Sequence, residues 1–190
     1  LFGGYNRYTY GSKLWKNIQF LPFQLRQFLG ARIESIPPEK LGKLLNIIPP
    51  LTGINLLGNK AHKFAKGIQN SQSLDEFYYS LTMEDSFYKR TAKSNQASSL
   101  LIDKSPLLFK LKDPEHRMMA WDLLTFLTDD ILCKVDRASM NVSLETRVPM
   151  LDHRLVEFAW KLPLNMKIRN GESKWILRQL LNKYIPKEML

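Results

Sequence analysis

The sequence predicts a mostly helical fold. Apolar side chains recur at helical spacing in several segments, for example over 12–29 and 54–68. Helix-start residues and prolines bound many of these segments. No alternation of useful length points to a β-strand, and no internal repeat is present. With 190 residues, the chain is long enough to bury one sizeable core, as a single domain or one lobe of a larger protein.

The first half of the sequence predicts one loop and then a series of helices. GGYNRYTYG at 3–11 has a glycine turn signal and predicts a loop or turn. The helix expected over 12–29 starts at Ser12 and is kinked or split by Pro22. The further expected elements are a short helix over 39–47 opened by Pro37 and Pro38, a helix over 54–68, and a helix after the capping box of Ser73 and Glu76.

The second half starts with a polar stretch, 91–103, that predicts a loop. Asp113 before Pro114 then predicts a helix start, because a capping carboxylate precedes a residue that needs no amide hydrogen. That helix is expected to end near residue 127. The remaining expected features are a new helix capped by Thr128, extended backbone at Val148 before Pro149, a helix capped by Asp152, and a last helix capped by Ser173.

Composition narrows the class of protein. Hydrophobic residues make up 44% and charged residues 24%, which is typical of a folded, soluble protein. No uncharged apolar run approaches the ~20 residues of a membrane helix. Cys133 is the only cysteine, so the chain cannot form an internal disulfide and a reducing, cytoplasmic location is expected. The net charge of +10 could serve nucleic acid, an acidic membrane surface or an anionic substrate, but its dispersal along the chain favours an ordinary solvated surface.

The segment 129–154 mixes charges of both signs with regularly spaced apolar residues, which predicts that it packs against a core. Asp129 and Asp130 fall in the first turn of an expected helix, where acidic side chains suit the helix dipole. Glu145 and Arg147 lie two apart in an extended segment and are expected to project to the same side. On a half-buried loop they form either a structural ion pair or a site for a charged ligand.

The residues themselves carry a resemblance. DDILCKVDRASMNVSLETRVPMLDHRLVEFAWKLP closely resembles the C-terminal synthetase domain of glutamine-dependent asparagine synthetases. LFGGYNRY at 1–8 and LNMKIRNGESKWILRQLL at 164–181 agree in the same order, and KYIPKEML follows the latter. The resemblance spans the chain but is specific over about 60 residues. The middle of the chain, roughly residues 9–112, matches only as a variable helical region.

The resemblance implies a fold and a place within it. The family's synthetase domain is an α/β ATP-pyrophosphatase (adenine nucleotide alpha hydrolase-like) domain, a parallel sheet flanked by helices, and residues 1–190 would be its C-terminal helical portion. The family's glutaminase domain and SGGxDS pyrophosphate loop would lie upstream, and a phosphate-neutralising lysine soon after the last residue. We therefore expect an internal fragment that is inactive alone, with the main residues for ATP and Mg²⁺ outside it.

The resemblance also implies site residues. Tyr5 matches the family's GGY tyrosine, which in related β-lactam synthetases pairs with a carboxylate to manage a proton. Asp130 is our first choice for that carboxylate and Asp129 the second, because the register departs from better-known members by about one residue. Glu145 and Arg147 match the ExRVP element near the nucleotide and aspartate site, where a guanidinium can bind carboxylate or phosphate. Asp136 and Arg137 match a further motif, and we interpret them as a structural ion pair. The chain's histidines show no metal-ligand spacing, so no metal site is expected within it.

The implied function is ATP-dependent amidation of L-aspartate through a β-aspartyl-AMP intermediate, with ammonia from glutamine and release of AMP and pyrophosphate. The implied partners are these small molecules and a glutaminase domain of the same protein, with no nucleic acid or membrane, and a homodimer is compatible with them. One alternative is a related amidotransferase acting on a sugar acid or a β-lactam precursor. The other is a basic helical module that binds nucleic acid, whose affinity would fall steeply with salt.

Overall fold

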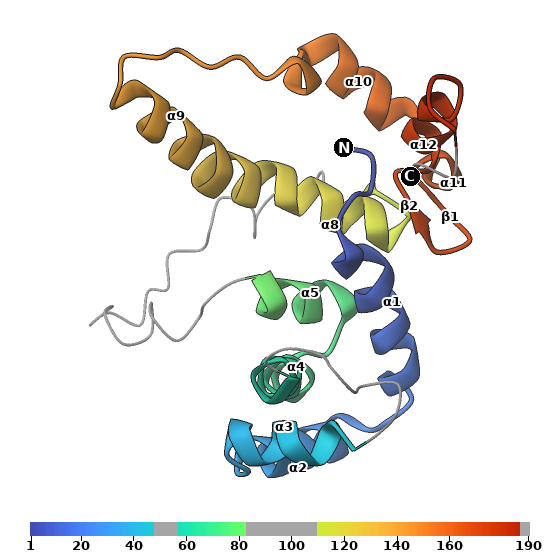
Figure 1. The fold of residues 1–190 in the computed structure, drawn as a ribbon. Helices are drawn as coiled ribbons and strands as arrows, with labels where there is room; N and C mark the ends of the chain where they lie inside the picture. Colours follow the sequence, from blue (N-terminus) through green and yellow to red (C-terminus); the bar gives the residue numbers. More distant parts are fainter. Residues whose placement is uncertain (48–56, 83–109, 187–190) are drawn as a thin grey trace. The chain divides into compact units, whose positions relative to one another are not determined.

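The computed structural model describes residues 1–47, 57–82 and 110–186, and it is mostly helical, as predicted (Figure 1). The chain forms two compact units. Unit 1 comprises Leu1–Tyr10 with Ser99–Leu190, and unit 2 comprises Gly11–Ser98. The boundary falls within helix α1 (Asn6–Ile18), so its first residues belong to unit 1 and the rest to unit 2.

Unit 2 is a helical unit organised around α4. Both α2 and α3 pack against α4, which also contacts α5. The bounds are α2, Phe23–Glu34; α3, Pro38–Leu45; α4, Leu57–Asn70; and α5, Leu74–Thr82. Pro22 is the N-cap of α2, which confirms the predicted break between two helices. Pro38 occupies the first turn of α3, as expected for a residue that needs no amide partner there.

The core of unit 2 is aromatic. The rings of Trp15 and Phe77 lie 5.6 Å apart, and Ile68 is buried beside them. The buried Arg26 places its guanidinium 4.9 Å from the Trp15 ring and donates a 2.9 Å hydrogen bond to the Ser71 carbonyl. A cation over an aromatic face, with a satisfied donor, tolerates burial better than an isolated charge. Gly30 lets α2 approach α4, because a Cβ there would lie 2.9 Å from the Ala65 carbonyl oxygen.

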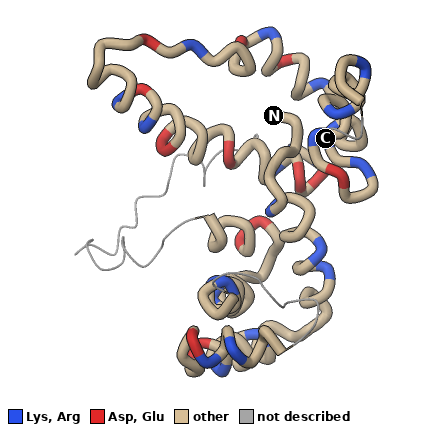
Figure 2. The backbone as a smooth tube through the Cα atoms, in the orientation of Figure 1, with Lys and Arg blue, Asp and Glu red and all other residues tan. Residues whose placement is uncertain are grey.

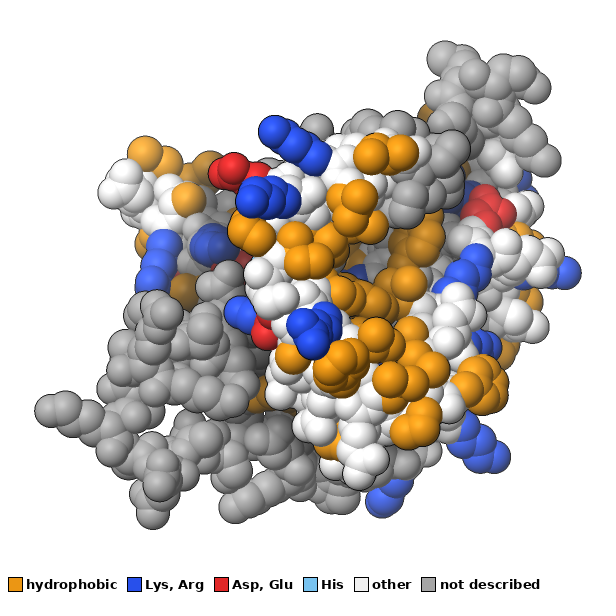
Figure 3. Space-filling model, turned by 90° about the horizontal axis from the view of Figure 1, so that it is seen from below, with side chains coloured by type: hydrophobic (Ala, Val, Ile, Leu, Met, Phe, Trp, Pro, Cys, Tyr) orange, Lys and Arg blue, Asp and Glu red, His pale blue; other side chains and the backbone are white. Residues whose placement is uncertain are grey.

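The outer face of α2 carries exposed apolar side chains. Leu25, Phe28 and Leu29 are spaced as neighbours on one helix face and are all exposed. Figure 3 views the molecule from the side on which α2 and α3 lie in Figure 1, and it shows hydrophobic side chains gathered on that face.

Unit 1 contains one continuous helical run made of three segments. Helix α8 (Pro114–Asp122) passes into the π-helical η2 (Leu123–Leu132) and then into α9 (Cys133–Met140). The predicted boundary near residue 127 is therefore wrong. Thr128 does not cap a new helix; its hydroxyl donates to the Leu124 carbonyl at 2.9 Å within the run. A threonine hydroxyl can either bond a carbonyl one turn earlier or cap the start of a helix. The local sequence does not distinguish these two roles.

The C-terminal part of unit 1 consists of short elements. These are the 3-10 turn η3, Pro149–Leu151; α10, His153–Lys161; α11, Leu164–Lys167; β1, Ile168–Arg169; β2, Glu172–Ser173; and α12, Trp175–Leu181. Asp152 caps α10 as predicted, because its Oδ1 accepts from the Arg154 amide at 2.9 Å. Val148 is extended before Pro149, also as predicted.

Strands β1 and β2 form an antiparallel hairpin that the sequence did not indicate to us, because each strand has only two residues. Its register pairs Ile168 with Ser173, and the turn residues Asn170 and Gly171 have φ of 53° and 83°. An Asn-Gly pair suits this turn, since both positions need positive φ. Ser173 therefore lies in β2, and the N-cap of α12 is Lys174, contrary to the prediction.

The N-terminal prediction is also partly wrong. The chain is non-helical over 1–5, but α1 begins at Asn6, within the predicted loop 3–11. Tyr8 is buried within unit 1, so packing there overrides a local composition typical of loops. The predicted loop 91–103 lies outside the described residues. Of the helices that the structure describes, none is both long and apolar enough to cross a membrane.

Candidate active site

A pocket of about 380 Å³ lies within unit 1. It is lined by the N-terminal segment, the α8–η2 run, η3 and the start of α12. Most of its lining side chains are leucine, methionine or phenylalanine. Its polar side chains are those of Tyr5, Tyr8, Asp122 and Lys174. A mostly apolar pocket with a few polar groups is the usual form of a small-molecule site.

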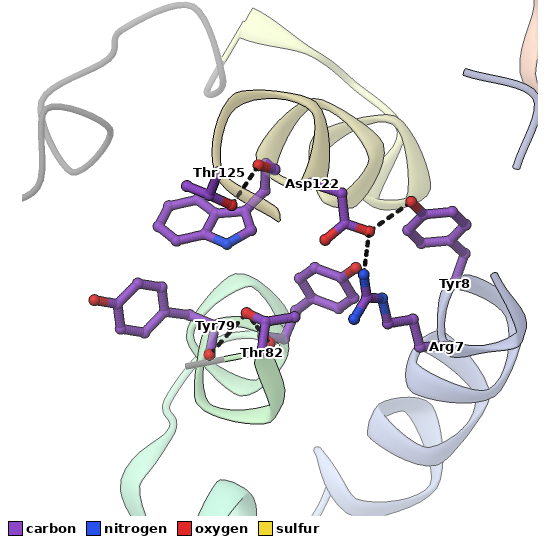
Figure 4. A network of polar contacts seen from close by, with 8 residues as sticks. Arg7, Tyr8, Tyr79, Thr82, Asp122 and Thr125 are labelled. Carbon is purple, nitrogen blue, oxygen red and sulfur yellow. Dashed lines mark hydrogen bonds and ion pairs between the residues drawn. The ribbon is translucent and has the colours of Figure 1, made fainter. Parts of the chain in front are cut away.

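Asp122, the last residue of α8, is the buried acidic group of this pocket. Only 4% of Asp122 is exposed, and its Oδ2 accepts from the Tyr8 hydroxyl at 2.6 Å and from an Arg7 guanidinium nitrogen at 2.8 Å (Figure 4). Burial and the hydrogen bond to Asp122 raise the pKa of Tyr8 well above its usual value. Tyr8 therefore stays a neutral donor, and Arg7 balances the carboxylate charge.

Arg7 also holds the ring of Tyr5. The guanidinium carbon lies 4.5 Å from the Tyr5 ring centroid and 4.9 Å from that of Phe126. The Tyr5 ring meets Phe126 edge to face at 5.9 Å and Tyr8 at 5.8 Å. These contacts restrain the Tyr5 side chain, although 45% of the residue is exposed. The structure thus places Tyr5 in the pocket wall, with its ring held by the half-buried Arg7 that pairs with Asp122.

The structure does not bring the expected carboxylate to Tyr5. Asp130 forms an ion pair with Lys134, one turn along the helix. Asp129 is exposed and accepts from the Thr128 hydroxyl at 3.2 Å. Neither Asp129 nor Asp130 lines the pocket, and no hydrogen bond within the described residues joins either one to Tyr5.

Glu145 and Arg147 pair with each other, as their spacing predicted, but they are not half-buried. Their side chains are 70% and 85% exposed, and neither lines the pocket. All residues of 141–150 are exposed, so the prediction that this segment packs against a core is wrong for the described chain. Apolar spacing shows which side chains could be buried together, but not whether a partner surface is present.

The prediction of an Asp136–Arg137 ion pair is also wrong. Both residues are exposed on α9, and no ion pair of either one occurs among the described residues. Adjacent residues on a helix do not face each other, so the sequence motif gives no geometric reason for the pair.

A second cluster of titratable groups lies in unit 1 around Lys167, which is fully buried. Its ammonium lies 4.8 Å from the Trp160 ring centroid and has no hydrogen-bond partner among the described residues. Burial lowers the pKa of Lys167 to about 8. Burial and the Lys167 charge lower the pKa of His116, whose Nδ1 lies 3.1 Å from Asp113. Neither Lys167 nor His116 lines the pocket.

Sequence reasoning missed Arg7, Asp122 and Lys174. The signal for Asp122 was available: it is an acidic residue within the apolar run WDLLTFL, where an unpaired charge would be costly. Its partners could not be read from the sequence, because Arg7 lies 115 residues away. Among the described residues no three His, Cys, Asp or Glu side chains gather in a way that could hold a metal ion.

The pocket of unit 1 has the size and the mostly apolar lining that are usual for a small-molecule site. The sequence model of the asparagine synthase family matches residues 1–190, and the chain belongs to that family. A putative glutamine-hydrolysing asparagine synthetase of Mycobacterium bovis is 32% identical over the whole chain, which covers 26% of that protein. Asparagine synthetase (glutamine-hydrolysing) 1 of Bacillus subtilis is 30% identical over the whole chain, which covers 27% of it.

A shorter match has a higher sequence identity. Asparagine synthetase (glutamine-hydrolysing) 3 of Bacillus subtilis is 45% identical over 69 residues, which are 36% of this chain and 11% of that protein. The chain thus spans about a quarter or less of the length of these relatives. No solved structure matches the chain.

Proposed function

We propose that this chain is the C-terminal portion of the synthetase domain of a glutamine-dependent asparagine synthetase. The observation that carries the proposal is the family match over residues 1–190, which includes the GGY segment whose Tyr5 lies in the pocket wall. The relatives that match the whole chain are asparagine synthetases by name. In this proposal the chain is a piece of an ATP-pyrophosphatase-type domain, and a glutaminase domain of the same protein supplies ammonia.

The proposed reaction activates aspartate before amidation. The oxygen of the side-chain carboxylate attacks the α-phosphorus of ATP, and the bond to pyrophosphate breaks. The resulting β-aspartyl-AMP has a good leaving group. Ammonia then attacks the acyl carbon, AMP leaves with the electron pair of the acyl–oxygen bond, and a base accepts a proton from nitrogen. An apolar pocket suits this chemistry, because excluded water strengthens charge stabilisation and protects the adenylate from hydrolysis.

Tyr5 is the proposed proton-handling residue of this reaction. Its ring is restrained by Arg7 and Phe126, which supports a fixed orientation of its hydroxyl in the pocket. Asp130 remains the first candidate for its carboxylate partner, one helical turn beyond Phe126, and Asp129 the second. In the free chain Asp130 pairs with Lys134, so this role requires the carboxylate to exchange that partner.

Glu145 and Arg147 are the proposed residues for the nucleotide or aspartate. Their exposure supports this role over a structural one, since an exposed ion pair contributes little stability and can exchange partners. The main residues for ATP phosphates and Mg²⁺ are proposed to lie outside this chain; among the described residues no three His, Cys, Asp or Glu side chains gather in a way that could hold a metal ion.

The proposal is tested in the intact protein that contains this chain. We expect aspartate- and ATP-dependent release of pyrophosphate, and formation of asparagine when glutamine or ammonia is added. Arg147→Ala and Tyr5→Phe should each lower pyrophosphate release or asparagine formation by about tenfold or more, because a lost charge-assisted contact costs about 1.5–3 kcal/mol. Arg32→Ala, which removes an exposed arginine of unit 2, serves as the matched control.

Two outcomes would contradict the proposal. Wild-type protein that releases no pyrophosphate with aspartate, but does so with a sugar acid or a β-lactam precursor, would move the function to a related amidotransferase. Wild-type turnover by Arg147→Ala would remove Arg147 from the site. Figure 2 shows basic and acidic residues interspersed along the described chain, which does not favour the nucleic-acid alternative.

A further inference from the structure

The acidic group of the pocket is already neutralised within the protein. Asp122 accepts from Arg7 and Tyr8, so the carboxylate and the guanidinium together carry no net charge. A ligand in this pocket therefore does not meet an uncompensated negative charge from Asp122. The remaining charged side chain in the pocket lining is that of Lys174.

Lys174 has no anionic partner among the described residues. The nearest acidic residue in sequence, Glu172, faces Arg178 instead, with 3.6 Å between Oε1 and Nε. The same Arg178 nitrogen donates to the Ser173 carbonyl at 3.0 Å, which fixes the guanidinium beside the hairpin. Lys174 as a residue is exposed to solvent and lines the pocket, so its side chain is accessible to a ligand oxygen there.

The backbone presents Lys174 to the pocket in a defined way. Lys174 has φ 55° and ψ 33°, a left-handed conformation that costs a non-glycine residue of the order of 1 kcal/mol. It directly follows the β1–β2 hairpin and precedes α12, so both elements constrain it. A conformation of this kind persists only where the surrounding structure holds it.

Gly4 completes the arrangement. A Cβ at Gly4 would lie 2.5 Å from Cε and 3.5 Å from Nζ of Lys174, so the lysine side chain occupies the space that another residue would fill. The lysine side chain thus rests against the residue that immediately precedes Tyr5. This contact places the Lys174 side chain against the backbone of the segment that carries Tyr5.

We propose that Lys174 is the anion-binding residue of the Tyr5 pocket, with an oxygen anion of the substrate, a carboxylate or a phosphoryl group, as its ligand. The inference rests on the proposed function for the identity of that substrate. Lys174 supplies a compact positive charge that suits either oxygen anion without bidentate geometry.

The test compares Lys174→Met with Lys174→Arg and Lys183→Met in the intact protein. Lys183 is an exposed lysine just after α12 that does not line the pocket, so it controls for loss of charge in the same region. We expect Lys174→Met to raise the KM for aspartate or for ATP about 10- to 100-fold in pyrophosphate release, the loss typical of one charged contact. Lys174→Arg should restore part of the lost affinity, and Lys183→Met should change neither the KM for aspartate nor the KM for ATP. The substrate whose KM rises identifies the carboxylate or the phosphoryl group as the ligand.

A direct binding measurement separates the two proposals. Calorimetric titration of the same proteins with aspartate and with AMP needs no turnover, and we expect Lys174→Met to weaken one of them by a similar factor. Absence of aspartate-dependent pyrophosphate release by the wild type, with this binding loss intact, would overturn the proposed function alone. Both KM values and both affinities within twofold of wild type in Lys174→Met would overturn the role of Lys174. Gly4→Ala, which displaces the lysine side chain, provides the second variant if Lys174→Met does not fold, and unchanged binding in Gly4→Ala would then overturn the role.

Discussion

Tyr8 and Asp122 show how a single pair of residues connects distant parts of unit 1. The 2.6 Å hydrogen bond joins α1 to the end of α8 across 114 residues of sequence. Because its acceptor is a buried carboxylate, this bond should contribute more than a neutral one.

Tyr8→Phe should therefore lower the free energy of unfolding of unit 1 by about 1.5–3 kcal/mol, since the carboxylate loses a donor that water cannot replace. Urea denaturation followed by fluorescence measures the change. Tyr10→Phe is the matched control on the same helix; Tyr10 is exposed, and its change should stay within about 0.5 kcal/mol. Equal effects of the two substitutions would show that the hydrogen bond to Asp122 contributes nothing specific.

Lys167 leads to a prediction of pH dependence. The pKa of Lys167 is lowered from about 10.5 when unfolded to about 8 when folded, because burial disfavours the ammonium; Asp113 opposes this shift. Below pH 8 the lysine is charged in both states, and the folded state bears the full cost of the buried charge. Between pH 8 and 10.5 the folded protein releases this proton while the unfolded chain keeps it, so stability should rise with pH over that window.

Lys167→Met should remove this dependence. Methionine has a similar length and no charge, so the variant should be more stable than wild type at pH 7, by about 1–3 kcal/mol, the cost of a buried polar group without a hydrogen bond. The difference should shrink by pH 10. His116 and the amino group of Leu1, whose pKa values burial and the Lys167 charge lower, titrate below this window. Thermal midpoints of both proteins at pH 7, 8, 9 and 10 test this, and a constant difference would contradict the assignment to Lys167.

At the scale of the elements, the boundaries set by local chemistry could be predicted. Pro38, Pro114 and Asp152 mark the helix starts expected of them, and Pro22 marks the expected break, because a ring or a capping carboxylate acts on its own neighbours. The π-helical η2 could not be predicted. Its apolar residues have the same spacing in sequence as those of an α-helix, and the change lies only in the hydrogen-bond pattern.

The capping box of α5 gives the element-scale prediction. The Glu76 amide donates to Ser73 Oγ at 3.2 Å, and the Glu76 carboxylate accepts from the Gln72 amide at 2.6 Å. Ser73→Ala should lower the stability of unit 2 by about 0.5–2 kcal/mol, because an amide of the first turn loses its acceptor. Ser73→Asn keeps an acceptor and should retain most of the stability. Urea denaturation of the wild type and both variants measures these free energies of unfolding. Equal losses of stability in the two variants would exclude capping by Ser73 as the cause.

At the scale of the whole molecule, the family and Tyr5 as a candidate site residue could be read from the sequence, and the pocket's charges could not. The GGY segment is local, so Tyr5 could be named from the sequence. The Arg7–Asp122 pair and the approach of Lys174 to Gly4 depend on contacts between segments more than 100 residues apart, which a single sequence does not reveal. The exposure of 141–150 was mistaken for burial for the same reason.

Two exposed apolar surfaces, one on each unit, lead to the last prediction. In unit 1, Val142 and Leu144 are exposed in the connection after α9; in unit 2, Leu25 and Phe28 are exposed on α2. Surfaces of this kind promote association, and the net charge of +10 opposes it through repulsion that salt screens. The isolated chain should therefore associate reversibly, and more strongly at 0.5 M salt than at 0.05 M.

Replacing Val142 and Leu144 by serine should weaken this association, and so should replacing Leu25 and Phe28. The two effects on the free energy of association should add in the fourfold variant if the two surfaces act independently, because they lie in separate compact units. Sedimentation velocity over a range of concentrations and both salt conditions measures this. Thr146→Ser, a polar change beside Leu144, is the control and should leave association unchanged. A wild-type chain that sediments as a monomer throughout would show that neither surface is adhesive, and association that weakens with salt would show that charge drives it.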